Sequence, residues 1–240
     1  MRRGLAAGLL AAGLGLCLSL PVAAQDEQPS GSPQKEAPTA TPDSAADKAP
    51  DTSQRYRVDG TSLIFDTVAK LEGKERGVRG SDVKALRNLL RRHRGITVLE
   101  LESTGGNHYA SMEIGALVID FGLDTHVRNI CESSCVTIFL GGTNRTLARG
   151  GRLGFHQLYW TPDDVEEYYK DNKEWGEWDT PFDFASWMYQ DTQTETFNRL
   201  SYMINRGVDP TFAIQSLRKP DASMWRPYRA VLLAAGVLTE

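Results

Sequence analysis

Three short segments contain the residue types that acyl transfer needs: a hydroxyl nucleophile, a base, and backbone donors for an oxyanion. Gly105 and Gly106 follow the apolar stretch ITVLELE, and glycines let a backbone approach a ligand closely. Ser133 and Ser134 stand where an expected strand passes into a helix, and His156 ends the stretch GRLGFH. Each feature also has a structural interpretation, because glycine pairs form turns, serines cap helices and a lone histidine usually belongs to a core. Their order along the chain makes them a candidate site.

Apolar patterning predicts the elements that must position these residues. We expect strands over 61–67, 96–102, 125–130 and 153–158, and helices over 81–93, 112–122 and 134–141. Alternating strands and helices of this length imply an α/β fold with βαβ units and a mostly parallel sheet. The three candidate segments all fall at strand boundaries, where sites in such sheets lie.

The motifs LESTGGN, CESSCVTIFLGG and RTLARGGRLGFH resemble, in this order, the Clp peptidases. The nearer likeness is to exported Clp-like proteins with a C-x-S-x-C signature, and it covers roughly 63–156 plus a C-terminal helix that ends in Gly-Val-Leu. It implies a Clp/crotonase-type fold of stacked βαβ units and serine peptidase activity. In the family a Gly-Gly turn forms the oxyanion hole, a serine at a helix start is the nucleophile, and a strand ending in His-Gln carries the base. Carried over, these roles fall on Gly105 and Gly106, Ser133, and His156.

The resemblance also bears on register and on a third catalytic residue. Ser133 lies nine residues before Gly142, as the nucleophile does in the family, so the likeness selects it over Ser134. The family's acid precedes the last helix, and Asp221 is the nearest carboxylate here. Counting back from Gly236 favours 223 or 224 instead, and Asp209 is a second candidate. Such an acid orients the histidine and is not itself the proton acceptor.

The N-terminus has the layout of a secretory signal over 1–24. Arg2 and Arg3 precede the apolar stretch 5–20, and Val22-Ala23-Ala24 forms a small-residue cleavage pattern. An uncleaved anchor is the alternative, although the apolar run is short for a membrane span. Residues 25–52 are rich in Pro, Ala and Ser and are expected to form a disordered linker. The domain is therefore expected over 53–240, in the periplasm or secreted, with no stable membrane insertion once the signal is cleaved.

Cleavage of the signal leaves two cysteines, Cys131 and Cys135. In an exported domain such a pair favours a disulfide over a reactive thiol. Four-residue spacing suits a disulfide if the local chain is nearly helical. A metal site is disfavoured because no second cysteine pair accompanies these two.

Charge and composition narrow the function classes. A net charge of −4 and a pI near 5.7 give no reason to expect nucleic-acid binding, and the basic residues of 81–93 fit a solvated helix face. The segment 160–191 is dense in Asp, Glu, Trp and Tyr. We interpret it as an acidic surface insertion, with a lid, an oligomer contact or a substrate groove as alternatives.

Two function hypotheses follow. The first is an exported serine hydrolase without a cofactor, an ATP-independent peptidase whose partners are peptides or unfolded proteins, with homo-oligomerisation left open. The second is a catalytically silent binding or scaffold protein on the same fold, because fold does not determine function.

Overall fold

The computed structural model describes residues 55–68, 76–220 and 223–240. The expected signal 1–24, the expected linker 25–52 and Asp221 lie outside the described residues. The strands are β1 (Tyr56–Asp59), β2 (Ser62–Asp66), β3 (Val98–Ser103), β4 (Asp124–Glu132), β5 (Arg145–Leu147) and β6 (Arg152–Gly154). The helices are α2 (Gly80–Arg92), α3 (His108–Asp120), α4 (Cys135–Leu140), α5 (Pro162–Gly176), α6 (Pro181–Asn205), α7 (Pro210–Gln215) and α8 (Arg229–Ala234).

The strands form one six-stranded sheet in the order β1-β2-β3-β4-β5, and β6 pairs with a second stretch of β4. Among the named strands of the described residues, β1 and β2 pair antiparallel and the other strand pairs are parallel. The fold is therefore α/β with a mostly parallel sheet, which confirms the fold class predicted from alternating strands and helices.

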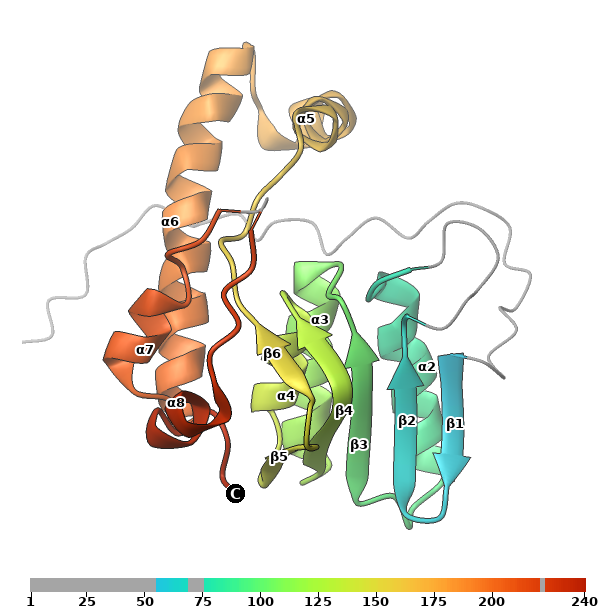
Figure 1. Cartoon of the computed structure of the whole chain (residues 1–240). Coiled ribbons are helices and arrows are strands. Elements are labelled where there is room, and N and C mark those ends of the chain that lie inside the picture. Colours follow the sequence, from blue (N-terminus) through green and yellow to red (C-terminus); the bar gives the residue numbers. More distant parts are fainter. Residues whose placement is uncertain (1–54, 69–75, 221–222) are drawn as a thin grey trace, which may run out of the picture. The chain divides into compact units, whose positions relative to one another are not determined.

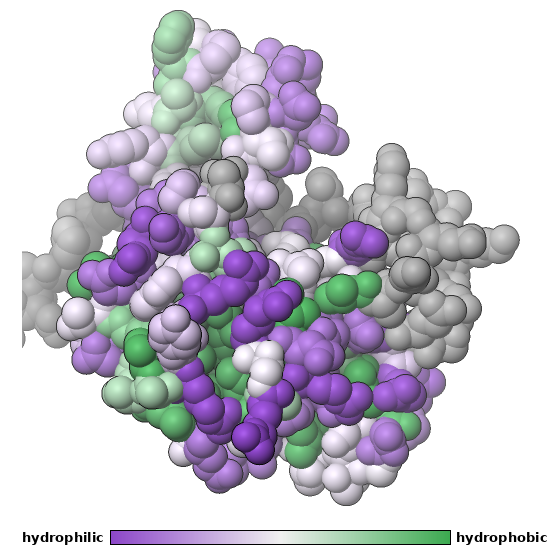
Figure 2. Space-filling view, viewed as in Figure 1, coloured by the Kyte–Doolittle hydropathy of each residue, from purple (hydrophilic) through white to green (hydrophobic). Residues whose placement is uncertain are grey.

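Helices α2, α3 and α4 cover one face of this sheet (Figure 1). Strand β3 alternates strictly, with Leu99 and Leu101 buried toward these helices. The intervening Glu100 forms an ion pair with Arg128 at 2.6 Å on the opposite face. Hydrophilic side chains are accordingly prominent over that face in Figure 2. One face of the sheet is thus packed against helices, and the other carries charged side chains.

Helical periodicity explains how the covering helices form. Val83, Leu86 and Leu90 of α2 recur at spacings of three and four residues and are buried in the core. Helix α3 begins where Asn107 Oδ1 accepts a hydrogen bond from the Ala110 N–H at 2.9 Å. Helix α4 buries all six of its residues, as its continuous apolar sequence predicts.

The segments after β6 depart most from the sequence prediction. A strand was expected over 153–158, but β6 ends at Gly154 because Phe155 leaves the sheet and exchanges backbone hydrogen bonds with Trp225. The acidic segment 160–191 forms α5 and the first part of α6. None of the helices in the described residues is long and apolar enough to cross a membrane.

Candidate active site

Ser133 occupies a sharp turn between the end of β4 and the start of α4. Its φ is +57°, in the left-handed region, which costs a non-glycine residue roughly 1–3 kcal/mol. The turn is held because the Ser133 N–H donates to the Gly154 carbonyl at 2.9 Å and the Val136 N–H donates to the Ser133 carbonyl at 3.1 Å. Strained backbone of this kind gathers at functional sites, where the surrounding structure enforces it.

The turn places the Ser133 hydroxyl against the imidazole of His156. Ser133 Oγ and His156 Nε2 are 2.6 Å apart, and the histidine is only 5% exposed. The neighbouring Ser134 hydroxyl instead donates to the Gly106 carbonyl at 3.1 Å. The two adjacent serines therefore have different partners, and Ser133 is the one in contact with a base.

A disulfide brackets this turn on both sides. Cys131 Sγ and Cys135 Sγ are bonded, their Cα atoms are 5.4 Å apart, and both residues are completely buried. The predicted disulfide is thus present in the structure. Cys131 is the second-last residue of β4 and Cys135 is the first residue of α4, so the disulfide restricts the backbone on both sides of Ser133.

The glycine pair approaches Ser133 from the end of β3. Both residues have positive φ, +101° for Gly105 and +142° for Gly106. A Cβ at Gly105 would lie 2.6 Å from the Ser133 Cβ, so this approach requires glycine. The Gly105 N–H donates to Ser103 Oγ at 3.1 Å, so it already has an acceptor and we correct the oxyanion-hole role expected of Gly105. Within the part of the chain that the structure describes, the N–H groups of Gly106 and Ser134 have no acceptor, so these two are left for a ligand oxygen.

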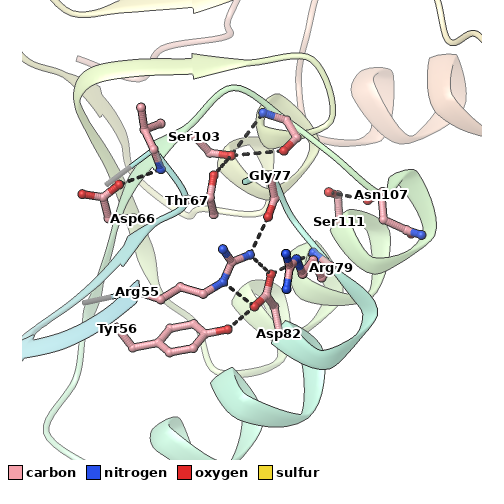
Figure 3. A network of polar contacts seen from close by, with 12 residues as sticks. Arg55, Tyr56, Asp66, Thr67, Gly77, Arg79, Asp82, Ser103, Asn107 and Ser111 are labelled. Atoms are coloured by element: carbon pink, nitrogen blue, oxygen red, sulfur yellow. Dashed lines mark hydrogen bonds and ion pairs between the residues drawn. The ribbon is translucent and has the colours of Figure 1, made fainter. Parts of the chain in front are cut away.

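A buried polar network around Arg55 and Asp82 contacts the segment that hydrogen-bonds to the Gly105–Gly106 turn (Figure 3). The Arg55 guanidinium donates to Asp82 Oδ1 at 2.7 Å and to the Gly77 carbonyl. The next residue, Val78, donates its N–H to the Gly105 carbonyl at 2.8 Å and accepts from the Asn107 N–H at 2.8 Å. The Arg55–Asp82 ion pair is therefore connected through one short segment to the turn that faces Ser133.

Helix α6 supplies a hydrogen bond to the backbone of His156 that no sequence pattern indicated. Arg199 of α6 is buried and donates to the His156 carbonyl at 3.1 Å. Burial lowers the pKa of this guanidinium to about 10, which leaves it charged at neutral pH. Helix α6 thus contributes to the placement of the base although it lies more than 40 residues further along the chain.

Ser133 and His156 open into a cavity of about 670 Å³, within the size range of small-ligand sites. One wall comes from Gly106 to Tyr109 at the start of α3, and the other from Leu158 to Thr161, Asp164 and Glu195. Segment 160–191, interpreted above as a surface insertion, therefore borders the dyad with Trp160, Thr161 and Asp164. Burial and the charge of Arg199 lower the pKa of His108 to about 4, so its imidazole is neutral.

The third catalytic residue remains a prediction. Asp221 lies outside the described residues. Asp209 caps α7, where its Oδ1 accepts from the Phe212 N–H at 2.9 Å, and it lines a different cavity with Trp225. Asp209 is therefore in structural use away from His156, and we correct that assignment. Met224, one of the positions favoured by counting, lines the cavity that contains the dyad.

Glu132, immediately before Ser133, was not singled out from the sequence. It is 5% exposed and pairs with Arg226 at 2.6 Å and with Arg152 at 3.5 Å. Its carboxylate links the nucleophile's strand to the segment before α8. In the described residues no group of three or more His, Cys, Asp or Glu side chains is placed to hold a metal ion.

Comparison with known proteins gives limited structural likeness. No family model matches the sequence, and no curated protein matches it. Among solved structures, the 1510-N membrane-bound stomatin-specific protease in complex with a substrate peptide has a TM-score of 0.44 at 13% identity, over 68% of this chain and 69% of that chain. A peptidase from Plasmodium falciparum has a TM-score of 0.45 at 10% identity, over 67% of this chain and 87% of that chain.

An enoyl-CoA hydratase/isomerase family protein from Silicibacter pomeroyi has a TM-score of 0.46 at 9% identity, over 77% of this chain and 73% of that chain. Proteins named as peptidases and proteins named for acyl-CoA chemistry are thus similar to this chain to the same degree. At these values the activity of none of them transfers to it.

Proposed function

We propose that this chain is a serine hydrolase that cleaves peptides, on a Clp/crotonase-type fold. The observation that carries the proposal is the 2.6 Å contact between Ser133 Oγ, in a left-handed turn, and the buried Nε2 of His156. A hydroxyl nucleophile requires a base within this distance, and the pair opens into a cavity large enough for a peptide segment. The three motifs that resemble the Clp peptidases support the same conclusion.

The geometry supports a two-step acyl transfer. Ser133 Oγ attacks the peptide carbonyl while His156 Nε2 takes the hydroxyl proton, and the carbonyl oxygen becomes an oxyanion that the Gly106 and Ser134 N–H groups stabilise. His156 then gives that proton to the departing amine, which leaves Ser133 acylated. Water attacks the acyl-enzyme with the same histidine as base, releasing the acid product and restoring the serine.

The signal-like N-terminus places this activity outside the cytoplasm in our proposal. An exported peptidase has no ATP-driven unfoldase beside it, so its substrates are short or already unfolded peptides. The disulfide across the nucleophile turn supports an oxidising compartment, because structural disulfides persist there.

Active-site labelling tests the proposal directly. A fluorophosphonate probe should form an adduct with the purified protein, and Ser133→Ala should abolish it in intact-mass spectra. Ser134→Ala is the matched control and should keep most of the adduct, because its hydroxyl contacts Gly106 and not the base. Absence of any adduct in the folded wild-type protein would favour the silent binding protein instead, and an adduct on Ser134 would place the nucleophile one residue later.

A further inference from the structure

The lining of the dyad cavity includes two carboxylate side chains and buried polar atoms without partners in the described residues. Its charged lining side chains, among the residues that the structure describes, are Asp164 and Glu195, and none is Lys or Arg. Asp164 is committed to capping α5, where its Oδ2 accepts from the Thr161 N–H at 3.2 Å. Glu195 of α6 is therefore the carboxylate that is available to a ligand.

Glu195 has unused hydrogen-bonding capacity. Its carboxyl interacts with the Tyr109 hydroxyl, but its Oε1 is buried and receives no hydrogen bond within the described part of the chain. The terminal torsion of a glutamate is broad and roughly two-fold, so a half-turn of the carboxylate exchanges the two oxygens. Burial raises the pKa of this carboxyl and the charge of Asp191 adds to the shift, although the Tyr109 hydrogen bond opposes it.

A second buried polar atom without a partner belongs to a residue that lines the same cavity. His108 Nδ1 is buried without a hydrogen-bond partner in the described residues. Because burial and Arg199 hold the pKa of this ring at about 4, the imidazole is neutral and one ring nitrogen is an acceptor. Buried polar atoms in native proteins are nearly always satisfied, so two orphans in one cavity indicate a ligand rich in donors.

The aromatic residues of the cavity favour the same ligand. Tyr109, Tyr159 and Trp160 line it and are 42%, 54% and 39% exposed. Aromatic faces attract ammonium and guanidinium groups, and the attraction adds to that of a carboxylate. Arg199 donates to the His156 carbonyl and is not among the described residues that line the cavity, so its guanidinium does not occupy the lining beside Glu195.

We propose that Glu195, with the His108 ring and the aromatic walls, forms a subsite that binds the Lys or Arg side chain of a peptide beside the Ser133 nucleophile. This inference rests on the proposed peptidase function for its catalytic consequence, but not for the binding itself. Glu195 is a specificity-determining residue in this scheme, and the dyad carries out the chemistry.

Ligand pairs that differ only in charge test the subsite without catalysis. N-acetyl-arginine amide should bind the wild-type protein in calorimetry at least about tenfold more tightly than its neutral isostere N-acetyl-citrulline amide. Glu195→Gln should remove that difference, while Glu167→Gln, an exposed α5 change outside the cavity, should preserve it. Equal binding of the two amides, or an undiminished difference in Glu195→Gln, would overturn the proposal. So would a preference for a free α-amine in norleucine amide, which would identify a peptide N-terminus as the ligand.

The catalytic arm uses peptides with arginine or citrulline at each position around the cleaved bond. At one position, the wild type should cleave the arginine peptide with a kcat/KM at least about tenfold higher than that of the matching citrulline peptide. In Glu195→Gln the two peptides should have equal kcat/KM, and the values for citrulline peptides should change by less than about twofold. If the wild-type protein binds the arginine amide but is not labelled by the probe, only the hydrolase proposal is contradicted. Labelling with no charge preference would defeat only the subsite. If Glu195→Gln does not fold, the wild-type comparison of the two amides decides the question.

Discussion

The region from β2 to α4 and the helices α5 and α6 differ sharply in how they are built. Helix α4 buries all six of its residues, whereas α5 buries none and the 25-residue α6 buries only Phe184, Arg199 and Met203. The first region holds Ser133 in a strained turn that is bracketed by the Cys131–Cys135 disulfide and packed against fully buried residues of α4. The second contributes side chains to a cavity wall and packs through a local aromatic cluster. In the proposed function, chemistry and substrate recognition therefore rest on regions that differ in burial.

The aromatic cluster explains how α5 and α6 stay together without a large core. Trp178 lies 4.8 Å from Phe184 and 4.7 Å from Trp187 between ring centroids, and Tyr168 stacks on Trp187. Both helices begin with a capping box and a proline in the first turn. These local devices stabilise each helix where tertiary burial is small. Changes in this region should alter recognition more than chemistry, and changes near the sheet should do the reverse.

The largest expected effect is at the base. His156→Ala should slow fluorophosphonate labelling and peptide cleavage together by about 10²–10⁴, because Ser133 then has no proton acceptor. Circular dichroism should show an unchanged fold. If this variant is labelled as fast as the wild type, His156 is a structural core residue, and the region from β2 to α4 does not carry the chemistry in the way proposed.

Loss of the disulfide should have the next largest effect. Replacing both Cys131 and Cys135 by serine should slow labelling by roughly tenfold, since the left-handed conformation of Ser133 relaxes when the bracket opens. The free energy of unfolding should change little for such a short closed loop. Reductant should slow the wild type and leave the double variant unaffected. Equal labelling rates of the two proteins would show that packing by itself maintains the turn.

Trp178→Ala should separate recognition from chemistry. The variant loses the centre of the aromatic cluster, so kcat/KM for peptides should fall by roughly fivefold while labelling by the small probe stays unchanged, since one buried side chain of this kind is worth a few kcal/mol to local order. Hydrogen exchange should rise in α5 and α6 and not in β3 or β4. Phe182→Ala is the matched control, because that side chain is 84% exposed. Faster exchange throughout the sheet would contradict the independence of the two regions.

The last expected effect is on stability and not on activity, as a pH dependence from His108. Its pKa is about 4 in the folded protein, below the ordinary value near 6.5, so the unfolded chain binds the proton more readily. The contribution of the neutral His108 imidazole to the free energy of unfolding is fully present above pH 6.5 and is lost as the pH falls toward 4. We expect about 2 kcal/mol less stability at pH 4.5 than at pH 7 from this group, measured by urea unfolding. His108→Gln should lessen the decline; an identical profile would show that the imidazole is not held neutral.

Local pattern was sufficient for most of the sheet region. Alternation predicted β2 and β3, the spacing of Val83, Leu86 and Leu90 predicted α2, and the apolar run after Ser134 predicted the buried α4. These elements are each buried on a face that their own sequence defines, so period and burial coincide. The order of Gly106, Ser133 and His156 at strand boundaries likewise predicted their proximity.

Only the tertiary structure decided the rest of the site. Arg199 and Glu132 contact residues 43 and 94 positions away, and Glu195 interacts with Tyr109 of a distant helix; such contacts leave no periodic signal. The exclusion of Asp209 depended on finding it at the start of α7. Sequence by itself determined which residues could react and in which elements they lie, because those properties follow from local pattern. The side chains that surround the proposed peptide site required packing between distant segments.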